Sequence, residues 1–216
     1  YHSFRQIASQ EEKDFFVFSC IRNPLEVAVT KFLKYKNKEG GGENYNNPKT
    51  WKKNGGWVTD YELKIFQYIQ DNDSSFSDFL HKFYSFTYDN WSCVAHKNFD
   101  YVIRYENLNS DFSNAIRQMG LEVKRDLPMY FKTPGKEDNL STYYTPDIRK
   151  HAANIFGPFM KKWGYGFPDS WGDCSIQWNR EMEYHVLGVP RYIYWRYVKQ
   201  QRGYRLSFLN QFNTKL

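Results

Sequence analysis

Residues 15–32 read FFVFSCIRNPLEVAVTKF, and this stretch decides the predicted fold. Residues 15–21 form a continuous apolar run with β-branched and aromatic members, which is typical of a strand buried on both faces of a parallel sheet. Asn23 and Pro24 follow as a predicted helix N-cap and first helical residue. The apolar residues after them recur with the spacing of a core-facing helical stripe: Leu25, Ala28, Val29 and Phe32.

A long polar loop and a helical region are predicted next. Residues 36–56 are rich in glycine, asparagine and lysine, which indicates an exposed loop of the kind that often carries function. No Gly-Lys-Ser/Thr follows its glycines, so it is not a phosphate-binding P-loop. Residues 58–94 are predicted to be helical, with apolar faces made of Leu63, Phe66, Ile69, Phe76, Phe79, Leu80 and Phe83.

A second strand is predicted over residues 99–108, FDYVIRYENL. It leads into SDFSNAIRQMGL, where Ser110 is the predicted N-cap of a helix and Gly120 its predicted end. Strands that are each followed by a helix predict an α/β fold in which helices flank a parallel sheet.

The C-terminal part is predicted to be mainly helical. One helix begins at Pro146, is interrupted at residues 157–158 by a glycine and a proline, and stops at Gly164. The texture then changes to basic and aromatic. We therefore predict an α/β domain over residues 1–166 and a helical extension, packed on that domain, over residues 167–216.

Composition limits the classes of protein that this chain can belong to. The 216 residues are 41% hydrophobic and include 7 Trp, 18 Tyr and 18 Phe, enough for a sizeable core. Mean hydropathy is -0.79, and the absence of long apolar runs excludes a transmembrane helix. The net charge of +6 favours anionic partners. The 3 cysteines have no metal-binding spacing, so no metal is expected.

Arg22 stands directly after the first predicted strand, where open α/β sheets place their ligands. The next helix would direct its N-terminal N–H groups and the positive end of its dipole to the same place. A guanidinium there is suited to phosphate or sulfate, because it can bind two oxygens at once. Thr30 lies about 12 Å further along the helix, on the flank shared with Asn23 and Glu26. A structural ion pair of Arg22 with a carboxylate is the alternative, and spacing alone does not separate the two.

Three segments resemble the carbohydrate sulfotransferases. FSCIRNPLEVAVTKF resembles their Phe-x-x-Val-Arg-Asn-Pro-Tyr-Asp-Arg-Leu-Val-Ser-x-Tyr, whose arginine and serine hold the 3′-phosphate of 3′-phosphoadenosine 5′-phosphosulfate (PAPS). The resemblance carries these roles to Arg22 and Thr30. FDYVIRYENLNSDFSNAIRQMGL is similar to a later strand and helix of the family, and YYTPDIRKHAANIFGPFMKKWGYGF to its closing helix. The resemblance as a whole covers most of residues 1–166 and implies a fold of P-loop-kinase type.

The chain also departs from the family pattern. Leu25, Glu26 and Val27 replace the Tyr-Asp-Arg after Asn-Pro, which removes a second arginine. The family's 5′-phosphosulfate loop, a P-loop relative, has no counterpart. Because that loop should precede the first strand, we expect it to lie N-terminal to Tyr1 in a longer protein.

The resemblance implies a candidate base, and the chemistry of other residues offers further candidates. Transfer of a sulfuryl group to an alcohol needs a base that takes the hydroxyl proton. In the uronosyl branch this base is a histidine about twenty residues before the Arg-Asn-Pro turn, and His2 holds that position; a surface or capping histidine is the alternative. Lys136 is a second candidate for the cofactor phosphate, against an ordinary exposed loop lysine. Three tryptophans could stack on sugars or simply belong to the core: Trp51, Trp57 and Trp91.

The leading hypothesis is therefore a PAPS-dependent sulfotransferase that acts on a hydroxyl of a carbohydrate. Alternatives are a sulfotransferase for a small metabolite or a protein acceptor, and a non-catalytic module that binds an anionic polysaccharide. Nucleic-acid binding is not expected, since the basic residues are dispersed among acids. The basic and aromatic VPRYIYWRYVKQQRGYR is also suited to contact with a membrane surface. The low cysteine content favours the cytoplasm over the Golgi lumen.

Overall fold

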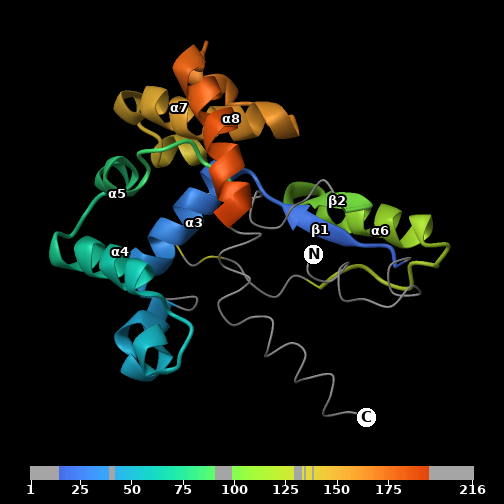
Figure 1. The fold of residues 1–216 in the computed structure, drawn as a ribbon, viewed down its shortest axis with the longest axis horizontal. Coiled ribbons are helices and arrows are strands. Elements are labelled where there is room, and N and C mark those ends of the chain that lie inside the picture. Colours follow the sequence, from blue (N-terminus) through green and yellow to red (C-terminus); the bar gives the residue numbers. More distant parts are fainter. Residues whose placement is uncertain are drawn as a thin grey trace. The chain divides into compact units, whose positions relative to one another are not determined.

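The computed structural model of the chain describes residues 15–38, 42–90, 99–128, 133, 135–137 and 139–194. This part is mixed α/β and mostly helical, with six α-helices and a small parallel sheet of two strands (Figure 1). The mixed α/β class agrees with the prediction. In the described part, no helix is both long enough and apolar enough to cross a membrane.

The chain divides into two compact units that are each built from separate segments. Unit 1 comprises Tyr1–Ile21, Asp89–Asp126 and Met182–Leu216, and unit 2 comprises Arg22–Tyr88 and Leu127–Glu181. The predicted domain boundary after residue 166 stays a prediction.

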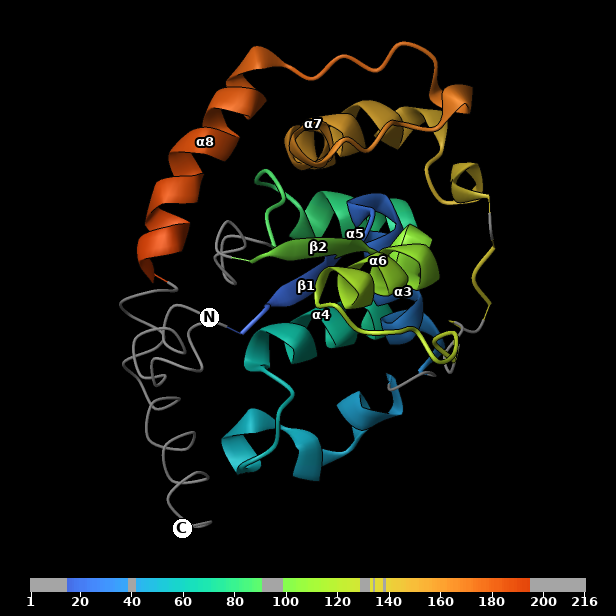
Figure 2. The same ribbon diagram turned by 90° about the vertical axis from the view of Figure 1, so that its right-hand side faces the viewer.

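The sheet belongs to unit 1. Strand β1 (Phe18–Ile21) pairs in parallel with β2 (Tyr101–Arg104), so that Phe18 lies opposite Tyr101. Helix α6 (Leu108–Gln118) follows β2, and Figure 2 shows it beside the two strands. Phe112 of α6 packs edge-on against Phe18, with ring centroids 6.0 Å apart. The sequence order of strand, helices, strand and helix is therefore the predicted one.

The prediction that residues 15–21 form a strand buried on both faces is wrong. The strand has four residues, and Phe18 is 37% exposed while Cys20 is also exposed. A parallel strand is buried on both faces only where further strands and helices cover it. In the described part of the chain, β1 has β2 as its one strand neighbour.

Ser110 does not cap α6, contrary to the prediction. The helix begins at Leu108, and the Ser110 hydroxyl donates to the carbonyl oxygen of Asn107 at 3.0 Å. A short 3-10 turn (Tyr105–Asn107) joins β2 directly to the helix, so the N-cap is Asn107, three residues before the predicted one. The predicted end is confirmed, because Gly120 has the left-handed φ of 73° that favours glycine.

Unit 2 holds the hydrophobic core around α3 (Pro24–Asn37). The predicted helix start is confirmed, since the Asn23 side chain accepts a hydrogen bond from the Leu25 N–H at 3.0 Å and Pro24 is the first helical residue. All members of the predicted apolar stripe are buried: Leu25, Ala28, Val29 and Phe32. They pack against α4 (Asp60–Asp71), α5 (Phe76–Phe83) and α7 (Pro146–Trp163) (Figure 1).

Residues 58–94 are not one helical region. The chain breaks between α4 and α5, where Asp73 takes a positive φ of 46° and Ser75 starts a new helix with a capping box. The described residues after Phe83, up to residue 90, are not helical. Six of the seven predicted apolar residues are buried, and Phe83 is partly buried against the core. The six buried residues are Leu63, Phe66, Ile69, Phe76, Phe79 and Leu80.

The predicted loop over residues 36–56 is more ordered than expected. Its described part forms three short 3-10 turns: Gly42–Asn46, Pro48–Thr50 and Lys52–Asn54. The Tyr45 side chain is buried and stacks on Phe66 in the core, with ring centroids 5.4 Å apart. Gly56 permits the tight return, because a Cβ there would lie 2.1 Å from the backbone of Thr50.

Helix α7 runs through residues 157–158 without the predicted interruption. Pro158 removes one backbone donor, but the surrounding residues of α7 are buried and their packing holds the helix together. Gly157 is needed for this packing, because a Cβ there would lie 2.6 Å from the Ile176 side chain. The predicted stop is confirmed by Gly164, which has a left-handed φ of 67°.

Candidate anion site at the start of α3

The candidate site begins where the chain leaves β1. Arg22 is the residue after the strand, and Asn23 caps the helix that follows. Backbone N–H groups at a helix start carry partial positive charge, so Arg22 and the first turn of α3 add up to a cationic environment. The Arg22 side chain is half-buried, which restricts the directions it can point.

Two predicted phosphate ligands meet at one carboxylate oxygen. The Nη2 of Arg22 lies 3.3 Å from Oε2 of Glu26, and the Nζ of Lys136 contacts the same oxygen. These three side chains are between 16% and 26% exposed. The structure thus brings together two cations that are far apart in the sequence, and it gives them a negative partner.

Tyr143 holds the short segment that carries Lys136. Its hydroxyl donates to the Gly135 carbonyl oxygen at 3.2 Å and accepts from the Glu137 N–H at 2.9 Å. These two bonds bracket Lys136 on both sides. Tyr143 is therefore a positioning residue for the lysine.

Tyr144 ties the same region to the first turn of α3. It is fully buried, and its hydroxyl donates to the Leu25 carbonyl oxygen at 3.0 Å. Burial raises the pKa of Tyr144 well above its usual range, and the nearby Tyr84 adds to the shift. The hydroxyl consequently stays protonated and remains a donor.

Lys136 reaches back along α3. A Cβ at Gly135 would lie 3.1 Å from Nδ2 of Asn37, in the last turn of the helix, whereas the Lys136 ammonium contacts Glu26 in the first. At 100° per residue, Glu26, Thr30 and Asn37 all lie on one flank of the helix. Gly135 and the Lys136 ammonium therefore both lie beside residues of the flank that carries Thr30.

Thr30 has a polar atom that lacks a hydrogen bond. Its Oγ1 is shielded from solvent and has no hydrogen-bond partner among the residues that the structure describes. A buried hydroxyl without a partner is costly, so such an atom calls for an explanation. Thr30 is one helical turn beyond Glu26, and a ligand oxygen could satisfy the hydroxyl.

The predicted sugar-binding tryptophans differ in their surroundings. Trp51 has a structural role, because its Nε1 donates to the Tyr45 carbonyl oxygen at 3.0 Å. The ring of Trp57 is 54% exposed, and the Lys34 ammonium lies 5.7 Å from its centroid. Trp91 and the predicted base His2 lie outside the described residues.

Sequence reasoning did not identify the role of Tyr143. It did leave open an ion pair of Arg22 with a carboxylate as the alternative to a phosphate site, and the structure has this pair, with Glu26 as the carboxylate. The i, i+4 spacing of Arg22 and Glu26 on a predicted helix was the available signal for that ion pair. Lys31 lies 6.0 Å from the Tyr35 ring centroid. Burial, aided by the Lys34 charge, lowers the Lys31 pKa, although Glu62 opposes the shift.

Comparison with known proteins gives no relative for this chain: no family model, no curated protein and no solved structure matches it. Among the described residues, no group of three or more His, Cys, Asp or Glu side chains could hold a metal ion. The residues at the start of α3 are therefore the basis for the function proposed below.

Proposed function

We propose that this chain binds the 3′-phosphoadenosine end of PAPS and takes part in sulfuryl transfer to a carbohydrate hydroxyl. The observation that carries this proposal is the convergence of Arg22 and Lys136 on one oxygen of Glu26. Thr30 lies one helical turn beyond Glu26, and its hydroxyl has no hydrogen-bond partner among the described residues. The resemblance assigns Arg22 and Thr30 to the 3′-phosphate, and Lys136 is the further candidate for the cofactor phosphate.

Glu26 supports the proposal rather than opposing it. Its carboxylate holds both cations in the arrangement that a phosphate oxygen would require, since both anions accept charge-assisted hydrogen bonds. A bound 3′-phosphate would compete with Glu26 for Arg22 and Lys136. The carboxylate would then repel the phosphate, so the affinity reflects the balance between these two effects.

The reaction requires little from the protein beyond placement of the reacting groups and charge. The acceptor oxygen attacks the sulfur of PAPS, the bond from sulfur to the 5′-phosphate oxygen breaks, and 3′-phosphoadenosine 5′-phosphate leaves. The proton of the acceptor hydroxyl goes to a base, for which His2 is the candidate. A P-loop-kinase type of fold is part of the same proposal.

Trp57 and Lys34 favour an acidic saccharide as the acceptor. An exposed indole face can cover the apolar side of a sugar ring, and the ammonium beside it suits a carboxylate or sulfate group. The same pair would also suit a second candidate function, a module that binds an anionic polysaccharide without transferring a group. Binding of the nucleotide separates the two functions.

The test is calorimetric titration with 3′-phosphoadenosine 5′-phosphate, with ATP as the comparison ligand that lacks the 3′-phosphate. We expect selective binding that Arg22→Ala weakens by roughly 2–4 kcal/mol, the scale for removing a charge-assisted contact. Arg117→Ala, on the exposed side of α6, is the matched control and should bind normally.

Glu26→Gln sharpens the test. It removes the competing charge, so we expect affinity for 3′-phosphoadenosine 5′-phosphate to rise by about 1 kcal/mol. An Arg22→Ala variant that binds as well as wild type would overturn the 3′-phosphate assignment. Equal binding of both nucleotides would do the same, and saccharide titration would then test the second function.

A further inference from the structure

Helix α8 (Trp178–Ile193) carries an apolar stripe that is exposed along its whole length. The stripe consists of residues that are between 47% and 74% exposed: Trp178, Met182, Val186, Val189 and Ile193. Their spacings of four, four, three and four residues place them within an arc about 80° wide on the helix. Five large apolar side chains on one exposed helical face form a surface of the kind that binds a partner.

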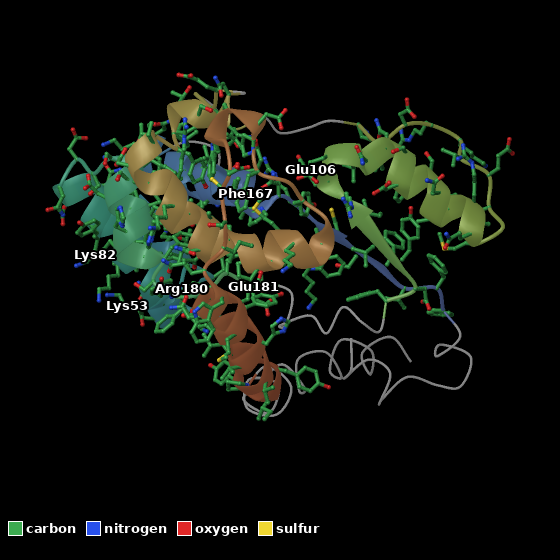
Figure 3. All side chains as sticks on the ribbon, turned by 90° about the horizontal axis from the view of Figure 1, so that it is seen from above. Lys53, Lys82, Glu106, Phe167, Arg180 and Glu181 are labelled. Carbon is green, nitrogen blue, oxygen red and sulfur yellow. The ribbon has the colours of Figure 1, made fainter. Side chains whose placement is uncertain are left out.

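The charged residues of α8 lie off this stripe. At the start of the helix, the Nη1 of Arg180 donates to the Ser85 carbonyl oxygen at 3.2 Å, and Glu181 pairs with Lys161 of α7 at 2.7 Å (Figure 3). Tyr184 is buried on another side of the helix. These contacts fix the orientation of the first turn of α8 about its own axis. No charged residue of α8 lies within the arc of the stripe.

The sequence from residue 184 onward is cationic and aromatic, whereas the first part of α8 also carries Glu181 and Glu183. From Tyr184 to the last residue there is no Asp or Glu, whereas six basic residues occur: Arg191, Arg196, Lys199, Arg202, Arg205 and Lys215. Tyr192, Tyr194, Trp195 and Tyr197 lie in the same region of sequence. Tyrosine and tryptophan are enriched at membrane interfaces, and clustered basic residues attract anionic lipid headgroups.

We propose that the stripe of α8 docks on the surface of an anionic lipid bilayer, with the helix axis parallel to the membrane plane. Apolar side chains on one face and basic residues nearby are the features that hold interfacial helices. A second copy of the chain is a poorer partner for the stripe. A second copy has the same cationic sequence after residue 183, so like charges oppose the pairing of two copies.

The test is flotation of the full chain with phosphatidylcholine vesicles that contain or lack about 30% phosphatidylserine, a fraction chosen to give a strong negative surface potential. We expect binding to the anionic vesicles that weakens with added salt, and weaker binding to the neutral ones. Val186→Asp and Val189→Asp should each reduce binding about tenfold, because each removes apolar burial.

Two further variants make the result specific. Leu121→Asp adds the same charge at another exposed apolar position, which is 57% exposed, and should bind like wild type. Met182→Gln removes apolar surface without adding charge and should still weaken binding. Circular dichroism and thermal unfolding should show each variant folded, since all these side chains are exposed in the structure.

Two results would overturn the proposal. The first is equal vesicle binding by wild type, the stripe variants and the Leu121→Asp control. The second is a dimer in light scattering that Val186→Asp dissociates, together with no vesicle binding by wild type, which would assign the stripe to a second copy of the chain.

Discussion

At the scale of single residues, Arg22 and Lys136 share one carboxylate, and an anion in the proposed site would compete with it for both cations. Both cations contact Glu26, and Tyr143 holds the lysine by bonding to the backbone on each side of it. A half-buried carboxylate between two cations is stable by itself. It also keeps the two cations in place for an anion that competes with it.

Thr30 provides the prediction at this scale. Thr30→Val removes a hydroxyl that is shielded and has no partner in the described part of the chain, while it keeps the shape of the side chain. We expect the free energy of unfolding in urea to rise by about 1 kcal/mol. Binding of 3′-phosphoadenosine 5′-phosphate should weaken by a similar amount.

Thr30→Ser is the control for this prediction. It keeps the hydroxyl and should change nucleotide affinity very little, although it loses a methyl group. A loss of stability in Thr30→Val would contradict the prediction, because it would mean that the hydroxyl makes a favourable bond in the unliganded protein.

At the scale of elements, the helix starts differ in how they are capped. Helices α4 and α5 begin with capping boxes, in which Thr59 and Ser75 bond to the third helical residue and receive a bond from it. Helix α6 begins at Leu108, and its N-cap Asn107 makes no side-chain cap bond. A serine near a helix start therefore has a different role in each case.

Ser75 and Ser110 test this difference directly. Ser75→Ala should lower the free energy of unfolding by about 1 kcal/mol, since it leaves backbone donors of α5 without partners. Ser110→Ala should change it by less than about 0.5 kcal/mol, because that hydroxyl caps no helix. Chemical denaturation of both variants gives the comparison, and equal losses would contradict the capping assignment.

At the scale of the whole molecule, a contact between two histidines joins α5 and α7, and the protonation of one of them makes stability depend on pH. The rings of His81 in α5 and His151 in α7 lie with centroids 4.5 Å apart, and the Nε2 of His151 is 3.0 Å from the Tyr84 carbonyl oxygen. Burial lowers the pKa of His151 below 6.5, with smaller contributions from His81 and Arg180. Hydrogen bonds to the backbone oppose the shift.

The lowered pKa of His151 determines how its contribution to the free energy of unfolding changes with pH. Between the folded pKa and the ordinary value of 6.5, the unfolded chain binds more protons at His151 than the folded chain does. The contribution of His151 to stability is therefore present above pH 6.5 and is lost as pH falls through the folded pKa. We expect His151→Gln to reduce the loss of stability between pH 7.5 and pH 5, compared with wild type.

Thermal unfolding across this pH range gives the measurement. His185→Gln changes an exposed histidine on α8 and should leave the wild-type slope unchanged. An identical slope in His151→Gln and wild type would show that His151 does not contribute to the pH dependence.

Several features were predictable because they depend on neighbours in the sequence. The start of α3 follows from Asn23 and Pro24, its buried stripe follows from helical spacing, and the end of α7 follows from Gly164. Arg22 and Thr30 were placed on the correct element for the same reason. Backbone preference and side-chain periodicity act over a few residues, so a single sequence displays them.

Other features depend on segments that meet only in the folded chain. Three such contacts join residues that are separated along the chain. Lys136 pairs with Glu26, the Tyr143 hydroxyl bonds to the backbone on both sides of Lys136, and the rings of His81 and His151 are in contact. The exposure of β1 depends on the number of neighbouring strands, and the continuity of α7 through Pro158 depends on packing around it. Local patterns in the sequence were enough for the start of α3, the end of α7 and the choice of Arg22 as a candidate residue, but not for the start of α6 or the break between α4 and α5. The partners of Arg22 and Lys136 depend on the tertiary structure. Burial and charge pairing act between segments that meet in space, so the order of residues along the chain does not reveal them.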